Sequence, residues 1–76
     1  MAFVYILRGE RWYVGSTIDL SRRIKEHARG KTHTTKRIGD WKLEKIFSTG
    51  TLKEAQELER RIKRSGHIER WIHAQF

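Results

Sequence analysis

Hydrophobic and polar positions at the start of the chain predict two short strands. Residues 3–7 are a run of β-branched and aromatic side chains, too short for a helix and typical of a buried strand. Residues 8–10 contain a glycine and predict a turn, after which residues 11–16 run back as a second strand. Together these segments predict an antiparallel hairpin.

A helical pattern follows the hairpin. The expected helix begins near residues 16–19 and ends before Gly30, and Arg23 and His27 lie one turn apart along one edge of its apolar stripe. The stripe consists of Leu20, Ile24 and Ala28. Two hydroxyl residues are available as the N-cap, Ser16 and Thr17.

The second half of the chain predicts a loop, a strand and two helices. Residues 29–40 have no periodicity and predict a basic loop, and residues 41–47 predict a third strand with Trp41, Leu43 and Phe47 on one side. Thr51 and Glu54 form a capping box for a helix that runs to about residue 65, before a glycine. Residues 67–76 predict a short last helix. The order is ββαβαα, which predicts an α+β fold with a three-stranded, mostly antiparallel sheet flanked by helices.

Length and composition narrow the function classes. The 76 residues allow one domain, 1–76, and the absence of cysteine excludes disulfides and thiolate metal sites. No pair of the four histidines has the spacing of a zinc site. No segment is long and apolar enough to span a bilayer, and the N-terminus lacks a signal pattern, so we expect no membrane association and a cytoplasmic protein. Seventeen Lys and Arg against nine Asp and Glu give a net charge of +8, which favours nucleic acid as the partner.

Glu59 is a charged residue at an apolar position. On the helix after Thr51, it falls within the arc formed by Leu52, Ala55, Leu58 and Ile62. Burying a carboxylate without a partner costs several kcal/mol, so it needs a counter-charge. Two interpretations are open: a buried salt bridge, with Arg23 as the expected partner, or a ligand for Mg²⁺, which uses few protein ligands.

Two tyrosines of the hairpin, Tyr5 and Tyr13, lie on facing strands and can project on the same side. Strand tyrosines are most often core aromatics, an isolated helix arginine is usually solvated, and a helix histidine is often partly buried or capping. Taken singly, neither tyrosine, nor Arg23, nor His27 indicates a function.

Taken together, these residues match a known pattern. The runs Val4-Tyr5-Ile6, Tyr13-Val14-Gly15-Ser16-Thr17 and Asp19 to His27, followed by Glu54 to Lys63, resemble the GIY-YIG nuclease superfamily from about residue 2 to residue 65. That superfamily includes homing endonucleases, some restriction enzymes and the incision subunit of bacterial nucleotide-excision DNA repair. The chain is most similar to its small stand-alone bacterial members. It departs from the pattern in Phe3, where the first motif has glycine, and in a short hairpin turn.

The resemblance implies a phosphodiesterase site formed by Tyr5, Tyr13, Arg23, His27 and Glu59. By position, Glu59 is the metal ligand for Mg²⁺ or Mn²⁺ and Arg23 is the essential arginine. Tyr13 is the implied general base, with Tyr5 positioning the water or phosphate. Because tyrosine is a weak acid, that role requires a phenolate stabilised by the metal and Arg23, and His27 remains a rival.

We expect nucleic acid, DNA foremost, to be held by basic side chains with low sequence specificity. The expected contacts are Arg22, Lys25, Lys31, Lys36, Arg37 and Lys42. One alternative is a nucleic-acid-binding module of the same fold without catalysis. Another is a protein-interaction domain that uses Trp71 and Phe76 of the last helix, which is also the candidate surface for a homodimer.

Overall fold

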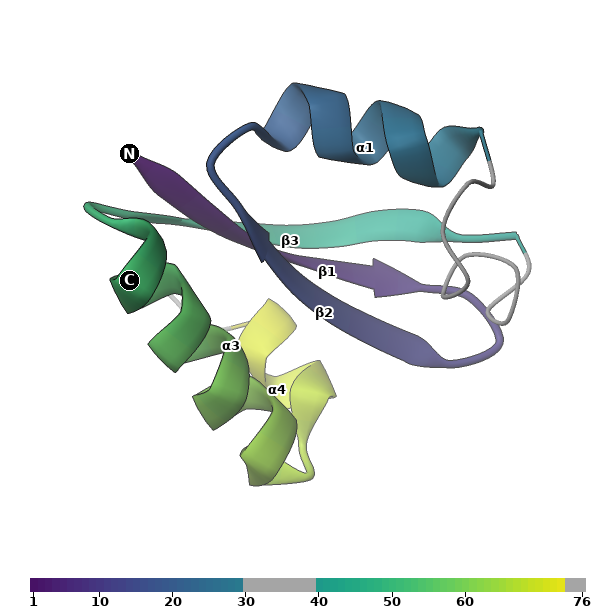
Figure 1. The fold of residues 1–76 in the computed structure, drawn as a ribbon. Helices are drawn as coiled ribbons and strands as arrows, with labels where there is room; N and C mark the ends of the chain where they lie inside the picture. Colours follow the sequence, from purple (N-terminus) through teal and green to yellow (C-terminus); the bar gives the residue numbers. More distant parts are fainter. Residues whose placement is uncertain (30–39, 74–76) are drawn as a thin grey trace.

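The structure is a computed structural model that describes residues 1–29 and 40–73. Its sheet has three antiparallel strands in the order β2-β1-β3, namely β1 (Ala2–Arg8), β2 (Trp12–Thr17) and β3 (Lys42–Thr49). Helix α1 (Leu20–Ala28) covers one face of the sheet, and α3 (Leu52–Ser65) lies with α4 (Ile68–Ile72) on the opposite side (Figure 1). The described elements therefore confirm the α+β prediction and its order.

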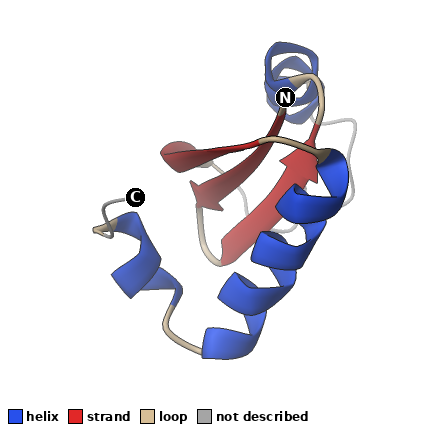
Figure 2. Cartoon of the chain, turned by 90° about the vertical axis from the view of Figure 1, so that its left-hand side faces the viewer, coloured by secondary structure: helices blue, strands red, loops and turns tan. Residues whose placement is uncertain are grey.

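The two faces of the sheet bury separate cores. Figure 2 shows the helices that cover these cores on either side of the strands. The α3-side core contains apolar side chains from the sheet and from α3, namely Ala2, Val4, Ile6, Val14, Phe47, Ala55 and Ile62. The α1-side core contains buried Tyr5 and Leu7, with Tyr13, Leu20, Ile24 and Trp41 packed against them. Burial on both faces explains why β1 is an unbroken apolar run.

The register of the hairpin places both tyrosines on the face of α1. Tyr5 pairs with Gly15, and Leu7 pairs with Tyr13. Since alternate residues of a strand point to opposite faces, Tyr5 and Tyr13 lie on one side and Val4 and Ile6 on the other. The predicted common orientation of the tyrosines is confirmed.

The prediction that Trp41, Leu43 and Phe47 lie on one side of the third strand is wrong in part. Ile6 pairs with Lys45 but Leu7 pairs with Leu43, so β3 contains an irregularity of one extra residue. An extra residue of this kind reverses which side chains face which side beyond it. Trp41 therefore packs in the α1-side core while Phe47 packs in the α3-side core.

Helix α1 differs from its prediction at its N-terminus and in its buried face. Ser16 and Thr17 belong to β2, and the N-cap is Asp19, whose side chain accepts a hydrogen bond from the backbone N–H of Arg22. Near the end of the helix His27 is buried and Ala28 is exposed, so the histidine occupies the inner position expected for the alanine.

Helix α3 begins and ends as predicted. The Thr51 hydroxyl accepts a hydrogen bond from the backbone N–H of Glu54, and Gly66 closes the helix in the left-handed conformation, with a φ of 68°. The last helix is shorter than expected, and the predicted anchor Phe76 lies outside the described residues. No described helix has both the length and the apolar character needed to cross a membrane.

Candidate active site

Three polar side chains form a network beneath α1. The Tyr5 hydroxyl lies 2.8 Å from Nε2 of His27, and Nε of Arg23 donates to the same hydroxyl at 3.3 Å. Tyr5 and His27 are 0% and 1% exposed. Because a guanidinium only donates, the Tyr5 oxygen accepts from Arg23, and the direction of the bond between Tyr5 and His27 is set by the imidazole tautomer. The network therefore fixes the orientation of all three groups.

Burial and charge set the protonation state of this network. Burial raises the pKa of the Tyr5 hydroxyl, and Tyr13 raises it further, while Arg23 opposes the shift. Burial also lowers the pKa of His27, and the positive charge of Arg23 adds to this effect. The hydrogen bond to Tyr5 raises the pKa of Arg23. At neutral pH the network consists of a phenol, a neutral imidazole and a guanidinium.

Tyr13 lies beside this network and is more open to solvent. Its ring centroid is 5.9 Å from that of Tyr5 and 5.2 Å from that of His27, and Tyr13 is half-buried where the other two are buried. Hydrogen bonding to Tyr13 also contributes to the raised pKa of Arg23. Among the two tyrosines and His27, Tyr13 is the one that a water molecule can reach.

Gly15 makes room for the Tyr5 hydroxyl. A Cβ atom at Gly15 would lie 2.6 Å from the hydroxyl oxygen and 2.7 Å from Cζ of Tyr5. Carbon atoms in proteins do not approach this closely without displacement of one of them. The buried tyrosine can hold its position under α1 only because residue 15 has no side chain.

Arg23 has a counter-ion on its own helix. Its Nη1 lies 2.9 Å from Oε2 of Glu26, while Nε of Arg22 lies 3.1 Å from Oε1 of the same carboxylate. The hydrogen bond from Arg23 holds the pKa of Glu26 below its usual range. With 35% of its side chain exposed, Arg23 combines a buried contact to Tyr5 with a solvent-facing guanidinium edge.

Glu59 contacts β2 from the α3 side of the sheet, opposite to the face that α1 covers. Its Oε1 accepts a hydrogen bond from the Ser16 hydroxyl at 2.7 Å, and its Oε2 lies 2.7 Å from Nζ of Lys63. The predicted salt bridge from Glu59 to Arg23 is wrong, because the ion-pair partner of Glu59 is Lys63. The carboxylate is half-buried, with 20% of its side chain exposed.

The two parts of the candidate site meet at β2. Gly15 contacts Tyr5 on the α1 side, and the next residue, Ser16, binds Glu59 on the α3 side. Because β2 is an edge strand, groups from both faces can reach its free edge (Figure 1). The structure thus brings Tyr5, Tyr13, Arg23 and His27 into direct proximity and connects Glu59 to them through two consecutive residues of one strand.

The donor set suits a hard divalent cation with few protein ligands. The described residues contain no cluster of three or more acidic or histidine side chains that could form a full protein cage. Mg²⁺ commonly binds one or two carboxylates and keeps several waters. A single carboxylate that is held by Ser16 and partly open to solvent fits such an ion, provided that Lys63 leaves Oε2.

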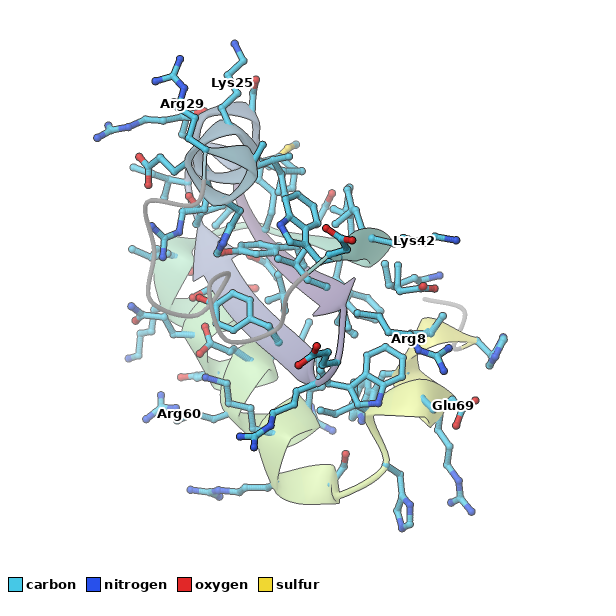
Figure 3. The ribbon with its side chains drawn as sticks, turned by 90° about the vertical axis from the view of Figure 1, so that its right-hand side faces the viewer. Arg8, Lys25, Arg29, Lys42, Arg60 and Glu69 are labelled. Carbon is cyan, nitrogen blue, oxygen red and sulfur yellow. The ribbon has the colours of Figure 1, made fainter. Side chains whose placement is uncertain are left out.

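The predicted nucleic-acid contacts do not all lie in one place. Arg22 and Lys25 line a shallow groove along α1 together with Arg23 and Arg29. Figure 3 shows Lys25 and Arg29 extending from α1 away from the sheet. Lys42 lies on β3, at the opposite edge of the sheet from β2. Three further predicted contacts lie outside the described residues, namely Lys31, Lys36 and Arg37.

Four residues around the site were missed by sequence reasoning, namely Gly15, Ser16, Glu26 and Lys63. Two of them could have been found from helix spacing. Glu26 lies three residues after Arg23, and Lys63 lies four residues after Glu59, which are the spacings of ion pairs on a helix. Gly15 and Ser16 had none beyond the motif, since their contacts depend on the hairpin register and on the packing of α3.

His27 should make the stability of the domain depend on pH. Since its pKa is lower in the folded than in the unfolded chain, the unfolded chain binds more protons as the pH falls. Stability should be retained above a pH of about 6.5, the unfolded value, and decline below it toward the folded value. Urea unfolding at pH 7.5 and 5.0 measures this loss. It should shrink in His27→Gln and persist in a control with the exposed His67→Gln, and equal losses in both variants would contradict the assignment.

Comparison with known proteins agrees with the family resemblance of the sequence motifs. A family model described as the GIY-YIG catalytic domain matches residues 1–67. The UPF0213 protein BH0048 of Halalkalibacterium halodurans is 38% identical over 64 residues, which cover 80% of this chain and 68% of that protein. The solution NMR structure of the UPF0213 protein BH0048 from Bacillus halodurans aligns at 37% identity with a TM-score of 0.51, covering 84% of this chain and 72% of that chain.

Proposed function

The chain belongs to the GIY-YIG catalytic domain family, a family of nucleases, and from that premise we propose that it is a metal-dependent endonuclease. It hydrolyses phosphodiester bonds in nucleic acid, mainly DNA, with low sequence specificity. The observation that carries the proposal is the Arg23–Tyr5–His27 network, with Tyr13 against it. A core built only for packing does not require a guanidinium ordered by a buried phenol.

Arg23 binds the phosphate that is cleaved. Its Nε is fixed by Tyr5, its Nη1 pairs with Glu26, and Arg23 lines the groove on α1. A planar guanidinium with a permanent charge suits two phosphate oxygens at once and stabilises the charge that grows on them. The phosphate competes with Glu26 for these donors, so substrate binding releases the Arg23–Glu26 pair.

Tyr13 takes the proton of the attacking water. Tyr5 and His27 are buried and bound to each other, whereas Tyr13 is half-buried and lies beside Arg23. Tyr5 and His27 then act as positioning residues, because they hold Arg23 in place and do not reach the reacting atoms.

Glu59 holds the divalent cation, Mg²⁺ or Mn²⁺. Such an ion neutralises charge on the phosphate and on the leaving oxygen when bound. Ser16 keeps the carboxylate of Glu59 against β2, one residue from the place where Tyr5 packs. The cation-binding group thus contacts residue 16 of β2, and the phenol that orders Arg23 packs against residue 15 of the same strand.

Basic side chains on α1 hold the nucleic-acid backbone. Arg22 and Lys25 line the groove that includes Arg23. Contacts of lysine and arginine with phosphates carry no sequence information, so this groove supports salt-dependent binding with low sequence specificity.

The proposal is tested by cleavage of labelled single-stranded, duplex and branched DNA and of RNA, with Mg²⁺ or with EDTA. We expect cleavage in Mg²⁺ only, and a rate on the order of 10³-fold lower in Glu59→Gln, because the charge that the cation supplies is lost. Glu57→Gln, which removes an exposed carboxylate from the same helix, should cut like the wild type. Equal cutting by the wild type and Glu59→Gln would refute the proposal. Binding without cutting by both would instead support a nucleic-acid-binding module.

A further inference from the structure

Among residues 1–29 and 40–73, each oxygen of the Glu59 carboxylate has one hydrogen-bond partner, a neutral hydroxyl on Oε1 and an ammonium on Oε2. We propose that Ser16 is a positioning residue for Glu59, and that Lys63 occupies the place of the divalent cation until the cation displaces it. This inference rests on the proposed function, because it concerns the same metal site. It assigns to Lys63 the control of metal affinity and to Ser16 the orientation of the ligand.

The Ser16 side chain has little freedom to move. Ser16 belongs to β2, where it pairs with Val4 in the interior strand of the sheet, and its short side chain donates to Oε1 of Glu59 at 2.7 Å. A hydroxyl on a strand has few accessible positions, so it fixes the rotation of the carboxylate. A neutral donor on Oε1 leaves the negative charge of Glu59 available to a cation on Oε2.

The Lys63 ammonium can separate from the Glu59 carboxylate at little cost. Nζ of Lys63 lies 2.7 Å from Oε2, but 51% of the lysine side chain is exposed, and it reaches Glu59 from one turn further along α3. A flexible, solvated ammonium in an i,i+4 pair loses little free energy when it separates. An ammonium and a divalent cation repel each other when both lie at one carboxylate oxygen, so the ion competes with Lys63 for Oε2.

In the metal-free domain, the ion pair with Lys63 stabilises the position of the Glu59 carboxylate. Without a counter-charge, a half-buried carboxylate would favour conformations that move it into water. Lys63 keeps Glu59 beside Ser16 and thus keeps the ligand in the orientation in which it receives the ion. The cost is a weaker apparent metal affinity, since the ion competes with a charge already present.

The test measures binding of Mn²⁺ alone to the full chain, by electron paramagnetic resonance and by calorimetry, without nucleic acid. Lys63→Met should tighten Mn²⁺ binding about two- to fivefold, the strength of an exposed helix pair. Ser16→Ala should weaken it about tenfold or more, as loss of a hydrogen bond to a metal ligand usually does, and Ser16→Thr should restore it. Lys53→Met removes the same charge from an exposed position in the first turn of α3 and is the matched control.

The outcomes separate the two proposals. If Glu59→Gln binds Mn²⁺ as tightly as the wild type, the metal site of the proposed function is wrong. If binding depends on Glu59 but Lys63→Met gives the same affinity as Lys53→Met, Lys63 is an ordinary surface ion pair and its proposed role is refuted. If Ser16→Ala keeps the wild-type affinity while its unfolding midpoint is unchanged, the positioning role of Ser16 is refuted.

Discussion

Tyr13→Phe is expected to lower the single-turnover cleavage rate on the order of 10²- to 10⁴-fold, the usual contribution of a general base. The substitution removes one oxygen from a half-buried ring that still packs against Tyr5 and His27. The fold should therefore survive. A base must be deprotonated to act, so the wild-type rate should rise with pH, and this rise should flatten in Tyr13→Phe. The measurement is the rate at saturating Mg²⁺ across a range of pH.

Tyr5→Phe is the matched control, because it removes the same atom from a buried tyrosine. Arg23 and His27 both lose their shared partner, so this variant should lose stability as well as some activity, while its pH profile keeps the wild-type shape. If His27→Gln flattens the profile and Tyr13→Phe does not, the base is His27 and the assignment to Tyr13 is wrong.

Gly15→Ala is expected to have the second large effect, lowering both stability and activity. The added methyl would lie 2.6 Å from the Tyr5 hydroxyl, whose position is fixed by His27 and Arg23. Overpacking of this kind costs about 1–3 kcal/mol, and a small displacement of Arg23 would lower the cleavage rate on the order of 10²-fold. Urea unfolding and single-turnover cleavage measure the two losses separately.

Gly50→Ala is the control for a methyl group on a glycine. A Cβ there would lie 3.1 Å from the end of the flexible Glu54 side chain, which can move away. Combining Gly15→Ala with Tyr5→Phe should reduce the stability cost of the added methyl, because part of the clash is removed. Equal stability and activity of the two alanine variants would contradict the proposed close approach of Tyr5 to β2.

The elements set by local signals could be predicted from the sequence. A short β-branched and aromatic run followed by a turn indicated the hairpin, and the capping box at Thr51 with the glycine at 66 gave both ends of α3. The start of α1 could not be placed, because Ser16, Thr17 and Asp19 are all good N-caps. The sheet register decides among them by including Ser16 and Thr17 in β2.

The side of each residue in β3 could not be predicted, because it depends on an irregularity in pairing with β1. The same limit applied to the site. The charge of Glu59 at an apolar position was visible in the helical pattern, but its partners Ser16 and Lys63 depend on how α3 lies against β2. His27 was expected along one edge of the apolar stripe of the helix and is fully buried, because its ring contacts Tyr5 and Trp41.

The α1-side core and the candidate site share their side chains, and this has an evolutionary consequence. Among the described residues, only Leu7 accompanies Tyr5 as a fully buried apolar residue there, whereas the α3-side core is made of side chains outside the proposed chemistry. Substitutions that stabilise the domain can accumulate beneath α3 without touching catalysis. Beneath α1 a substitution at Tyr5 would loosen the helix and impair the site together. Loss of activity through Tyr5 would therefore also cost stability, whereas loss through Glu59 would leave the buried residues of both cores in place.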